Sequence, residues 1–193
     1  MSINRILVGL AVVILLIIIG IIVIVGGGGE KPPTADVVEV RPLPEYSTTN
    51  AEVSMTVRGI INGEDLHRSI RITVSQNQRR LDIIFGYSGT IDKAFSFDNS
   101  QPAYEEFLYA IAGAGFLNGK EGLSEAASNP KGKCPLGQLS TFELTDGIET
   151  VSSLWSSTCG TKVGTLAGSS SVLQQLFRLQ ITDYNELVSG VQL

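Results

Sequence analysis

The sequence has little of the chemistry on which metal sites and nucleophilic sites depend. It contains one histidine, two cysteines and one tryptophan in 193 residues. A single histidine excludes the common sites in which several histidines hold a metal. Two cysteines together with a distant His67 do not complete a tetrahedral zinc site. The sequence therefore predicts neither a metal nor a cofactor.

Basic residues are also scarce. The chain has 14 lysines and arginines against 19 aspartates and glutamates, for a formal net charge of −5. Nucleic-acid-binding domains are typically basic, because each phosphate contact requires a positive charge. Tight docking onto anionic lipid headgroups also requires basic clusters. We therefore expect no nucleic acid as a partner.

The chain does contain one long uncharged hydrophobic run, at residues 6–25. A helix of this length is about 30 Å long, which matches the hydrocarbon core of a bilayer. The run is rich in Val, Leu and Ile all round and lacks the polar face of a helix in a soluble domain. It predicts a single transmembrane signal-anchor helix over 6–25, with the lipid bilayer as its partner.

A cleaved signal peptide is the main alternative for this run. Signal peptides have shorter apolar stretches, of about 7–15 residues, with a small-residue cleavage site after them. Cleavage within residues 26–29, which are all glycine, stays open. Arg5 and the free amine precede the run, whereas Glu30 and Lys31 after it cancel. The positive-inside bias then places residues 1–5 in the cytoplasm and the rest outside the cell membrane.

Two segments come after the predicted anchor. Residues 26–50 contain four consecutive glycines and four prolines, a composition typical of a linker that is both flexible and extended. Residues 51–193 are long enough to form one domain with its own core.

Strict alternation of apolar and polar residues predicts an antiparallel meander in the first half of this domain. Asn62-Gly63 favours a turn between the first two strands. The positions expected to point to the core are Val53, Met55, Val57 and Ile61, then Ile70, Ile72 and Val74, then Leu81, Ile83, Phe85 and Tyr87, and finally Ile91, Phe95 and Phe97.

Helices are predicted in three places. Asn99 or Ser100 caps a helix whose buried face carries Tyr104, Phe107, Leu108 and Ile111. A second helix begins at residues 169–171. Asp183, three residues before Glu186, resembles a capping box for a short third helix. The predicted fold class is α+β, with an antiparallel sheet of about six strands and about three helices on one face.

The second half of the domain contains a predicted hairpin over 139–144 and 148–157. Asp146-Gly147 favours a tight two-residue turn, because both positions need positive φ. Such a turn pairs Phe142 with Val151, Gln138 with Trp155, and Cys134 with Cys159. That face, with Leu136 and Leu144, is expected to point into the core. Cys134 and Cys159 therefore predict a disulfide in an exported domain, with two buried free thiols as the alternative.

Few residues are candidates for a functional site, and no catalytic set emerges. His67 could act as a general base, but its place among Arg68, Arg71 and Asp65 indicates an exposed rim. Adjacent carboxylates such as Glu105-Glu106 do not converge on one substrate as a glycosidase pair must. The interaction patch that we expect on the outward face of the sheet consists of Arg58, Arg68, Arg71 and Arg80.

These observations favour a membrane-tethered extracytoplasmic domain of the cell envelope that binds a partner and is not an enzyme. The partner would be a protein or an anionic envelope polymer. One alternative is a cell-envelope hydrolase, with carboxylate chemistry or chemistry based on His67. The other is a structural subunit of a membrane complex, assembled through the membrane helix.

Overall fold

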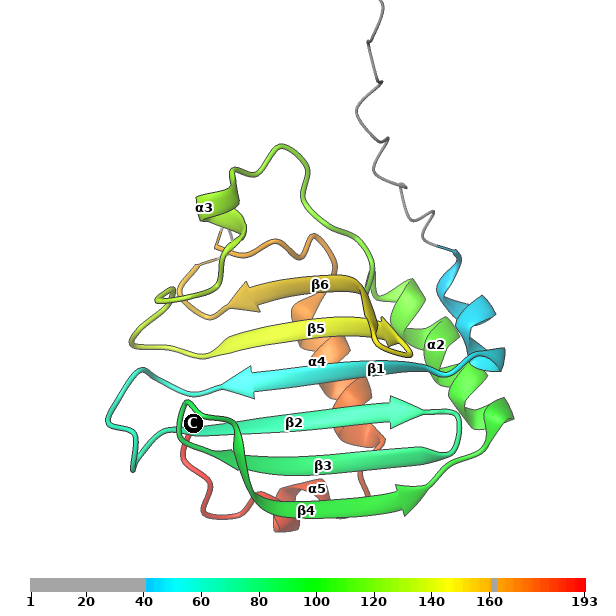
Figure 1. Cartoon of the computed structure of the whole chain (residues 1–193), viewed down its shortest axis with the longest axis horizontal. Coiled ribbons are helices and arrows are strands. Elements are labelled where there is room, and N and C mark those ends of the chain that lie inside the picture. Colours follow the sequence, from blue (N-terminus) through cyan, green and yellow to red (C-terminus); the bar gives the residue numbers. More distant parts are fainter. Residues whose placement is uncertain (1–40, 161–162) are drawn as a thin grey trace, which may run out of the picture. The chain divides into compact units, whose positions relative to one another are not determined.

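The computed structural model describes residues 41–160 and 163–193. The predicted anchor over 6–25 and nearly all of the linker lie outside these residues. Within the described part of the chain, no helix is long and apolar enough to cross a membrane. The described residues form a six-stranded antiparallel sheet in the order β4-β3-β2-β1-β5-β6 (Figure 1).

The sheet consists of two parts joined along β1. Strands β1 (Ala51–Arg58), β2 (Arg68–Ser75), β3 (Gln78–Phe85) and β4 (Thr90–Asp98) form the predicted meander. Strands β5 (Leu139–Asp146) and β6 (Glu149–Ser157) form a hairpin that pairs with the free edge of β1. The six strands and their antiparallel arrangement confirm the α+β class.

Helices cover one face of this sheet. The two longer helices, α2 (Gln101–Gly113) and α4 (Ser170–Leu179), both lie behind it in Figure 1. The Phe107 ring of α2 meets the Phe177 ring of α4 edge to face, with centroids 5.2 Å apart. Three shorter elements complete the described fold: the 3-10 helix η1 (Leu43–Thr48), α3 (Glu125–Ser128) and α5 (Tyr184–Leu187).

The core lies between the sheet and these helices, and it confirms most of the alternation read from the sequence. The inward residues of β1 are each at most 1 % exposed, and Ile70, Ile72 and Val74 of β2 are at most 2 % exposed. Three predicted core positions of the meander are wrong: Ile61, Tyr87 and Ile91 are 40 %, 49 % and 45 % exposed. Ile61 and Tyr87 lie beyond the ends of β1 and β3, and Ile91 lies on the edge strand β4.

Helix α2 packs as its sequence predicts. It begins after Ser100, and the four predicted residues of its inner face are its buried residues. The Tyr104 hydroxyl donates a hydrogen bond of 2.9 Å to the carbonyl oxygen of Ala51, at the start of β1. This buried bond fixes the helix against the middle of the sheet.

The register of the β5–β6 hairpin differs from the prediction by three residues over most of its length. Phe142 pairs with Leu154 instead of Val151, and Trp155 pairs with Thr141 instead of Gln138. The turn residues are Gly147 and Ile148, and a register shift lies between Leu144 and Thr145. A register shift by an odd number of residues moves each side chain to the opposite face of the sheet. Trp155 therefore lies on the face away from Phe142, buried, with its indole Nε1 donating to the Ser128 carbonyl oxygen at 2.6 Å.

The predicted disulfide is confirmed: Cys134 and Cys159 are bonded, with their Cα atoms 5.4 Å apart. The structural basis of this bond differs from the one predicted, because Cys134 and Cys159 lie outside the paired residues of β5 and β6. A turn in which the Gly137 N–H donates to the Cys134 carbonyl oxygen returns the chain toward Cys159. A side chain at Gly137 would place Cβ 2.8 Å from Cys134 Sγ. Leu136, expected in the core, is 89 % exposed on this turn.

The C-terminal helices occur where predicted, with different ends. Helix α4 buries Leu173 and Phe177. The capping box at Asp183 does not form, because Asp183 adopts a left-handed conformation with φ 56° and its side chain caps nothing in α5.

The buried Tyr104 hydroxyl predicts a pH dependence of stability. Burial, together with the nearby Glu52 and Asp146 carboxylates, raises the pKa of Tyr104 well above 10. Between pH 10 and that raised pKa the unfolded state binds fewer protons than the folded state, so stability falls as pH rises. Tyr104→Phe should lower the free energy of unfolding by about 1–3 kcal/mol at pH 7 and show a weaker alkaline decline. Chemical denaturation from pH 7 to 11 measures both effects.

Tyr109→Phe is the matched control, since Tyr109 lies on the same helix and is 58 % exposed. Equal stability of the two variants at pH 7, or equal alkaline slopes, would contradict the role given to the Tyr104 hydrogen bond.

Candidate functional site

The structure places His67 in the interior, against the prediction of an exposed rim. His67 is 2 % exposed, and its ring stacks on the Tyr87 ring with centroids 3.9 Å apart. Its Nδ1 lies 3.1 Å from the Ile60 carbonyl oxygen. The Tyr87 hydroxyl in turn donates to the carbonyl of Asn62. The prediction of an exposed His67 failed because it relied on the charged residues near it in sequence. These do not reveal that the chain before His67 folds back, so that the Ile60 carbonyl oxygen contacts the imidazole ring.

The four arginines of the predicted patch do not share one face. The register places Arg58, Arg71 and Arg80 on the face away from the helices, whereas Arg68 alternates to the other face. Arg80 forms an ion pair of 2.7 Å with Asp82. Arg58 donates to the Lys133 carbonyl oxygen at 2.9 Å. Arg71 is thus the member of the patch whose guanidinium has no hydrogen-bond or ion-pair partner among the described residues.

Metal ligands do not gather in the described ranges either. There, no group of three or more His, Cys, Asp and Glu side chains could hold a metal ion.

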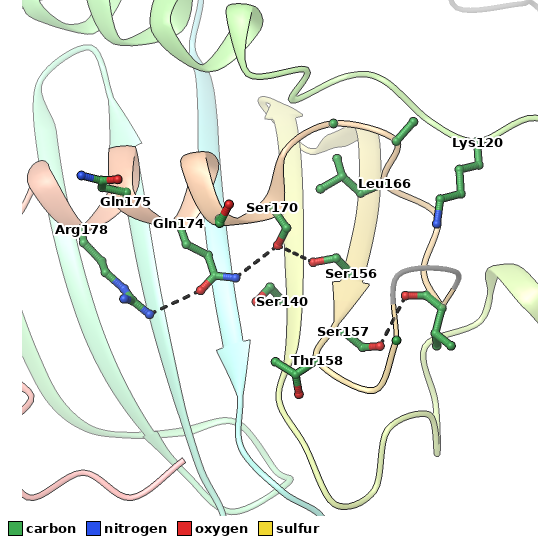
Figure 2. Close-up of a pocket in the computed structure, with 15 residues that line it drawn as sticks. Lys120, Ser140, Ser156, Ser157, Thr158, Leu166, Ser170, Gln174, Gln175 and Arg178 are labelled. Carbon is green, nitrogen blue, oxygen red and sulfur yellow. Dashed lines mark hydrogen bonds between the residues drawn. The ribbon is translucent and has the colours of Figure 1, made fainter.

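A concave site of the described residues is a groove between α4, the ends of β5 and β6, and the segment after β6 (Figure 2). Its volume is about 720 Å³. Two glutamines, Gln174 and Gln175, and two cationic residues, Lys120 and Arg178, contribute to its lining. Six lining residues carry hydroxyl groups: Ser140, Ser156, Ser157, Thr158, Ser170 and Ser171. We call this site the serine groove.

At the floor of the serine groove, polar side chains replace the apolar ones that otherwise cover the helix-facing side of the sheet. Ser140 pairs with Val57 on one side and with Ser156 on the other, so both serines point to the helix-covered face. Its neighbours along β5 on this face are Phe142 and Leu144, which are at most 1 % exposed, and Asp146 ends the strand on the same face. Ser140 is 4 % exposed, and its hydroxyl has no hydrogen-bond partner in the described part of the chain.

A chain of hydrogen bonds runs along the groove from α4 to β6 (Figure 2). Arg178 Nη2 donates to Gln174 Oε1 at 3.4 Å, and Gln174 Nε2 donates to Ser170 Oγ at 3.2 Å. Ser170 Oγ lies 2.6 Å from Ser156 Oγ. These bonds hold four side chains of the groove in fixed positions.

The start of α4 is held in place by close backbone packing. The Ser169 N–H donates to the Ala114 carbonyl oxygen at 2.9 Å, which ties the start of α4 to the end of α2. At Gly168 a Cβ atom would lie 2.7 Å from that same oxygen, so only glycine permits the approach. The position of the groove wall therefore depends on Gly168.

No family model matches the chain, and no curated protein matches it in sequence.

The sequence prediction missed the serine groove, although a signal was present. In the correct register, the inward positions of β5 read Leu144, Phe142 and Ser140, and Ser156 is the inward neighbour of Ser140. Two adjacent serines on a core face indicate a polar pocket. The three-residue register error placed these residues in unrelated positions.

The Ser140 hydroxyl, which opens into the groove without a partner among the described residues, predicts a nearly neutral mutational effect. Because the hydroxyl is open to the groove and makes no hydrogen bond to the described residues, Ser140→Ala should change the free energy of unfolding by less than about 0.5 kcal/mol. Thr165→Val is the matched control. Thr165 is 8 % exposed and its Oγ1 accepts a hydrogen bond of 2.9 Å from the Trp155 N–H.

That control should lower the free energy of unfolding by about 1–3 kcal/mol, because it leaves a buried N–H unsatisfied. Urea denaturation of the two variants measures the difference. A loss of stability in Ser140→Ala equal to that in Thr165→Val would show that the Ser140 hydroxyl is satisfied in the folded protein.

Proposed function

We propose that this protein is a membrane-tethered extracytoplasmic domain of the cell envelope that binds a partner in the serine groove. The observation that carries this proposal is the groove itself, a site lined by hydroxyl and amide groups where the sheet would otherwise continue its apolar core. Preformed concave sites with a few convergent polar groups are the usual form of a binding site.

The location outside the cytoplasm rests on two features. The apolar run over 6–25 has the length of a membrane span, and its flanks favour translocation of the domain that comes after it. The Cys134–Cys159 bond is of the kind that persists in oxidising compartments.

Binding is favoured over hydrolysis by the chemistry of the groove. A carboxylate-based hydrolase requires two facing carboxylates, and none of the described lining residues is acidic. Hydrolysis based on His67 would require a serine and an acid beside the imidazole. The ring contacts instead Tyr87 and the Ile60 carbonyl oxygen.

The third interpretation, a structural subunit assembled through the membrane helix, predicts that the groove is dispensable. The anchor can be replaced by an unrelated membrane helix while the domain is kept. Retained partner binding after this exchange would favour the groove over the anchor.

Membrane topology is tested in intact cells. External protease should release a fragment of the domain size, and this fragment should migrate differently on gels with and without reductant, because the disulfide closes a loop. Cys134→Ser should abolish the reductant-dependent difference, and a cytoplasmic marker protein should stay intact. Full protection of the chain, with both thiols open to alkylation, would place the domain in the cytoplasm. Release into the medium without protease would indicate cleavage near residues 26–29.

Partner binding is tested by blocking the groove. Ser171 lines the groove and is exposed, so Ser171→Trp should fill the groove without entering the core. Binding of the full chain, in detergent micelles, to isolated cell-envelope material should fall at least about tenfold, because the ligand and the indole ring compete for one volume.

Val172→Trp is the matched control, since Val172 is the next residue of α4, is 45 % exposed and lies outside the groove lining. Equal binding by the two tryptophan variants would contradict the groove as the binding site.

A further inference from the structure

The serine groove is lined by hydroxyl groups and two cationic side chains and, among the described residues, by no carboxylate, which favours an anionic ligand. We propose that the floor of the groove, where α4 begins above Ser140 and Ser156, binds an oxyanion of an anionic envelope polymer. The oxyanion is a carboxylate or a phosphoryl group carried by the polymer. This inference rests on the proposed function and names the ligand class of the same site.

The first donors are backbone N–H groups of α4. This helix has ten residues, and its N-cap residue Ser169 makes no side-chain cap hydrogen bond. The N–H groups of Ser170 and Ser171 have no partner among the residues that the structure describes. Unsatisfied N–H groups and the positive end of the helix dipole together favour an anion.

Ser140 is an independent indication of a ligand. It lies on the sheet opposite the start of α4, lines the groove and is 96 % buried, because its exposed fraction is 4 %. Its hydroxyl has no partner within 41–160 and 163–193. The fully buried side-chain atoms without a partner in the described residues are Arg58 Nε and Asn62 Oδ1, so the Ser140 oxygen is open to the groove and available to a ligand that binds there.

The hydrogen-bonded chain along α4 adds a further donor. Ser170 Oγ accepts from Gln174, and one of the two hydroxyls of Ser170 and Ser156 donates to the other. The pair uses one of its two hydroxyl hydrogens, so one remains for a ligand. Gln174 Oε1 is already occupied by the Arg178 guanidinium. The chain therefore presents one hydroxyl donor to a ligand.

Charge favours the same ligand. The lining includes Lys120 and Arg178 and, among the described residues, no acidic side chain. The chain as a whole carries a net charge of −5, so the groove is locally more positive than the rest of the protein. An anion is attracted to this site, although the protein as a whole is acidic.

The dimensions of the groove favour a polymer over a free ion. A water molecule occupies about 30 Å³ in the liquid, so a groove of about 720 Å³ far exceeds the space that one phosphate or carboxylate group requires. No aromatic side chain of the described residues lines the groove, so it offers no ring on which a neutral sugar could stack. Recognition here depends on charge and hydrogen bonds.

The test is calorimetric titration of the full chain in detergent micelles with three polymers. Poly(glycerol phosphate) supplies phosphoryl oxyanions, oligogalacturonate supplies carboxylates, and dextran is neutral. At least one anionic polymer should bind and dextran should not, and binding should weaken as NaCl increases. The anionic polymer with the lower Kd identifies the source of the oxyanion.

Two groove variants and one control locate the site. Ser140→Ala and Arg178→Gln should each raise the Kd about five- to tenfold, because each removes one hydrogen bond to the ligand or its support. Arg178→Gln should also reduce the salt dependence. Arg71→Gln, on the opposite face of the sheet, should leave the Kd unchanged.

Three results would overturn the inference. Dextran binding that is as tight as anionic binding and equally sensitive to Ser140→Ala would leave the groove as the binding site with a neutral ligand. If none of the polymers binds although Ser171→Trp blocks envelope binding, the proposed function stands and the oxyanion assignment is wrong. Loss of anionic binding in Arg71→Gln, with Ser140→Ala unaffected, would move the site to the open sheet face and contradict both proposals.

Discussion

The burial of one sheet face is the constraint on which the rest of this structure depends. Strand β1 lies at the centre, and its alternate side chains Val53, Met55 and Val57 are completely covered. Because side chains alternate strictly along a strand, this coverage determines which residues of each neighbouring strand must be apolar. Helices α2 and α4 supply the cover, and the Tyr104 bond to the Ala51 carbonyl joins the first of them to β1. The pair Ser140 and Ser156 is where this apolar face is interrupted, and the serine groove lies there.

The meander could be predicted from sequence because its alternation is strict and its connections are short. The hairpin could be predicted in outline only. The Asp146-Gly147 signal located the turn within one residue, since the turn residues are Gly147 and Ile148. A register shift between Leu144 and Thr145 then increases the difference between the predicted and the observed pairing. Nothing local in the sequence marks that shift, because pairing of β5 with β1 decides it. The disulfide prediction was correct for a different reason, since a turn outside the ladder brings Cys134 to Cys159.

The candidate site depends on this register, which is why the sequence alone did not reveal it. Arg58, Arg71 and Arg80 share the open face as predicted, but Arg80 and Arg58 already have partners in Asp82 and the Lys133 carbonyl. His67 is part of the interior packing through its stack on Tyr87. The groove differs from both, because its hydroxyl and N–H groups are positioned by packing and some have no partner in the described chain. Donors held in place without acceptors are preorganised for a ligand.

We propose the serine groove, and not the open sheet face, as the binding surface, and an amide chemical-shift titration tests this most directly. The full chain, labelled with ¹⁵N in detergent micelles, would be titrated with poly(glycerol phosphate). The account predicts that shift changes gather at Ser170 and Ser171 of α4 and at Ser140 and Ser156 below them. Changes confined to Thr56, Arg71 and Thr73 on the open face, or no localised changes at all, would contradict it.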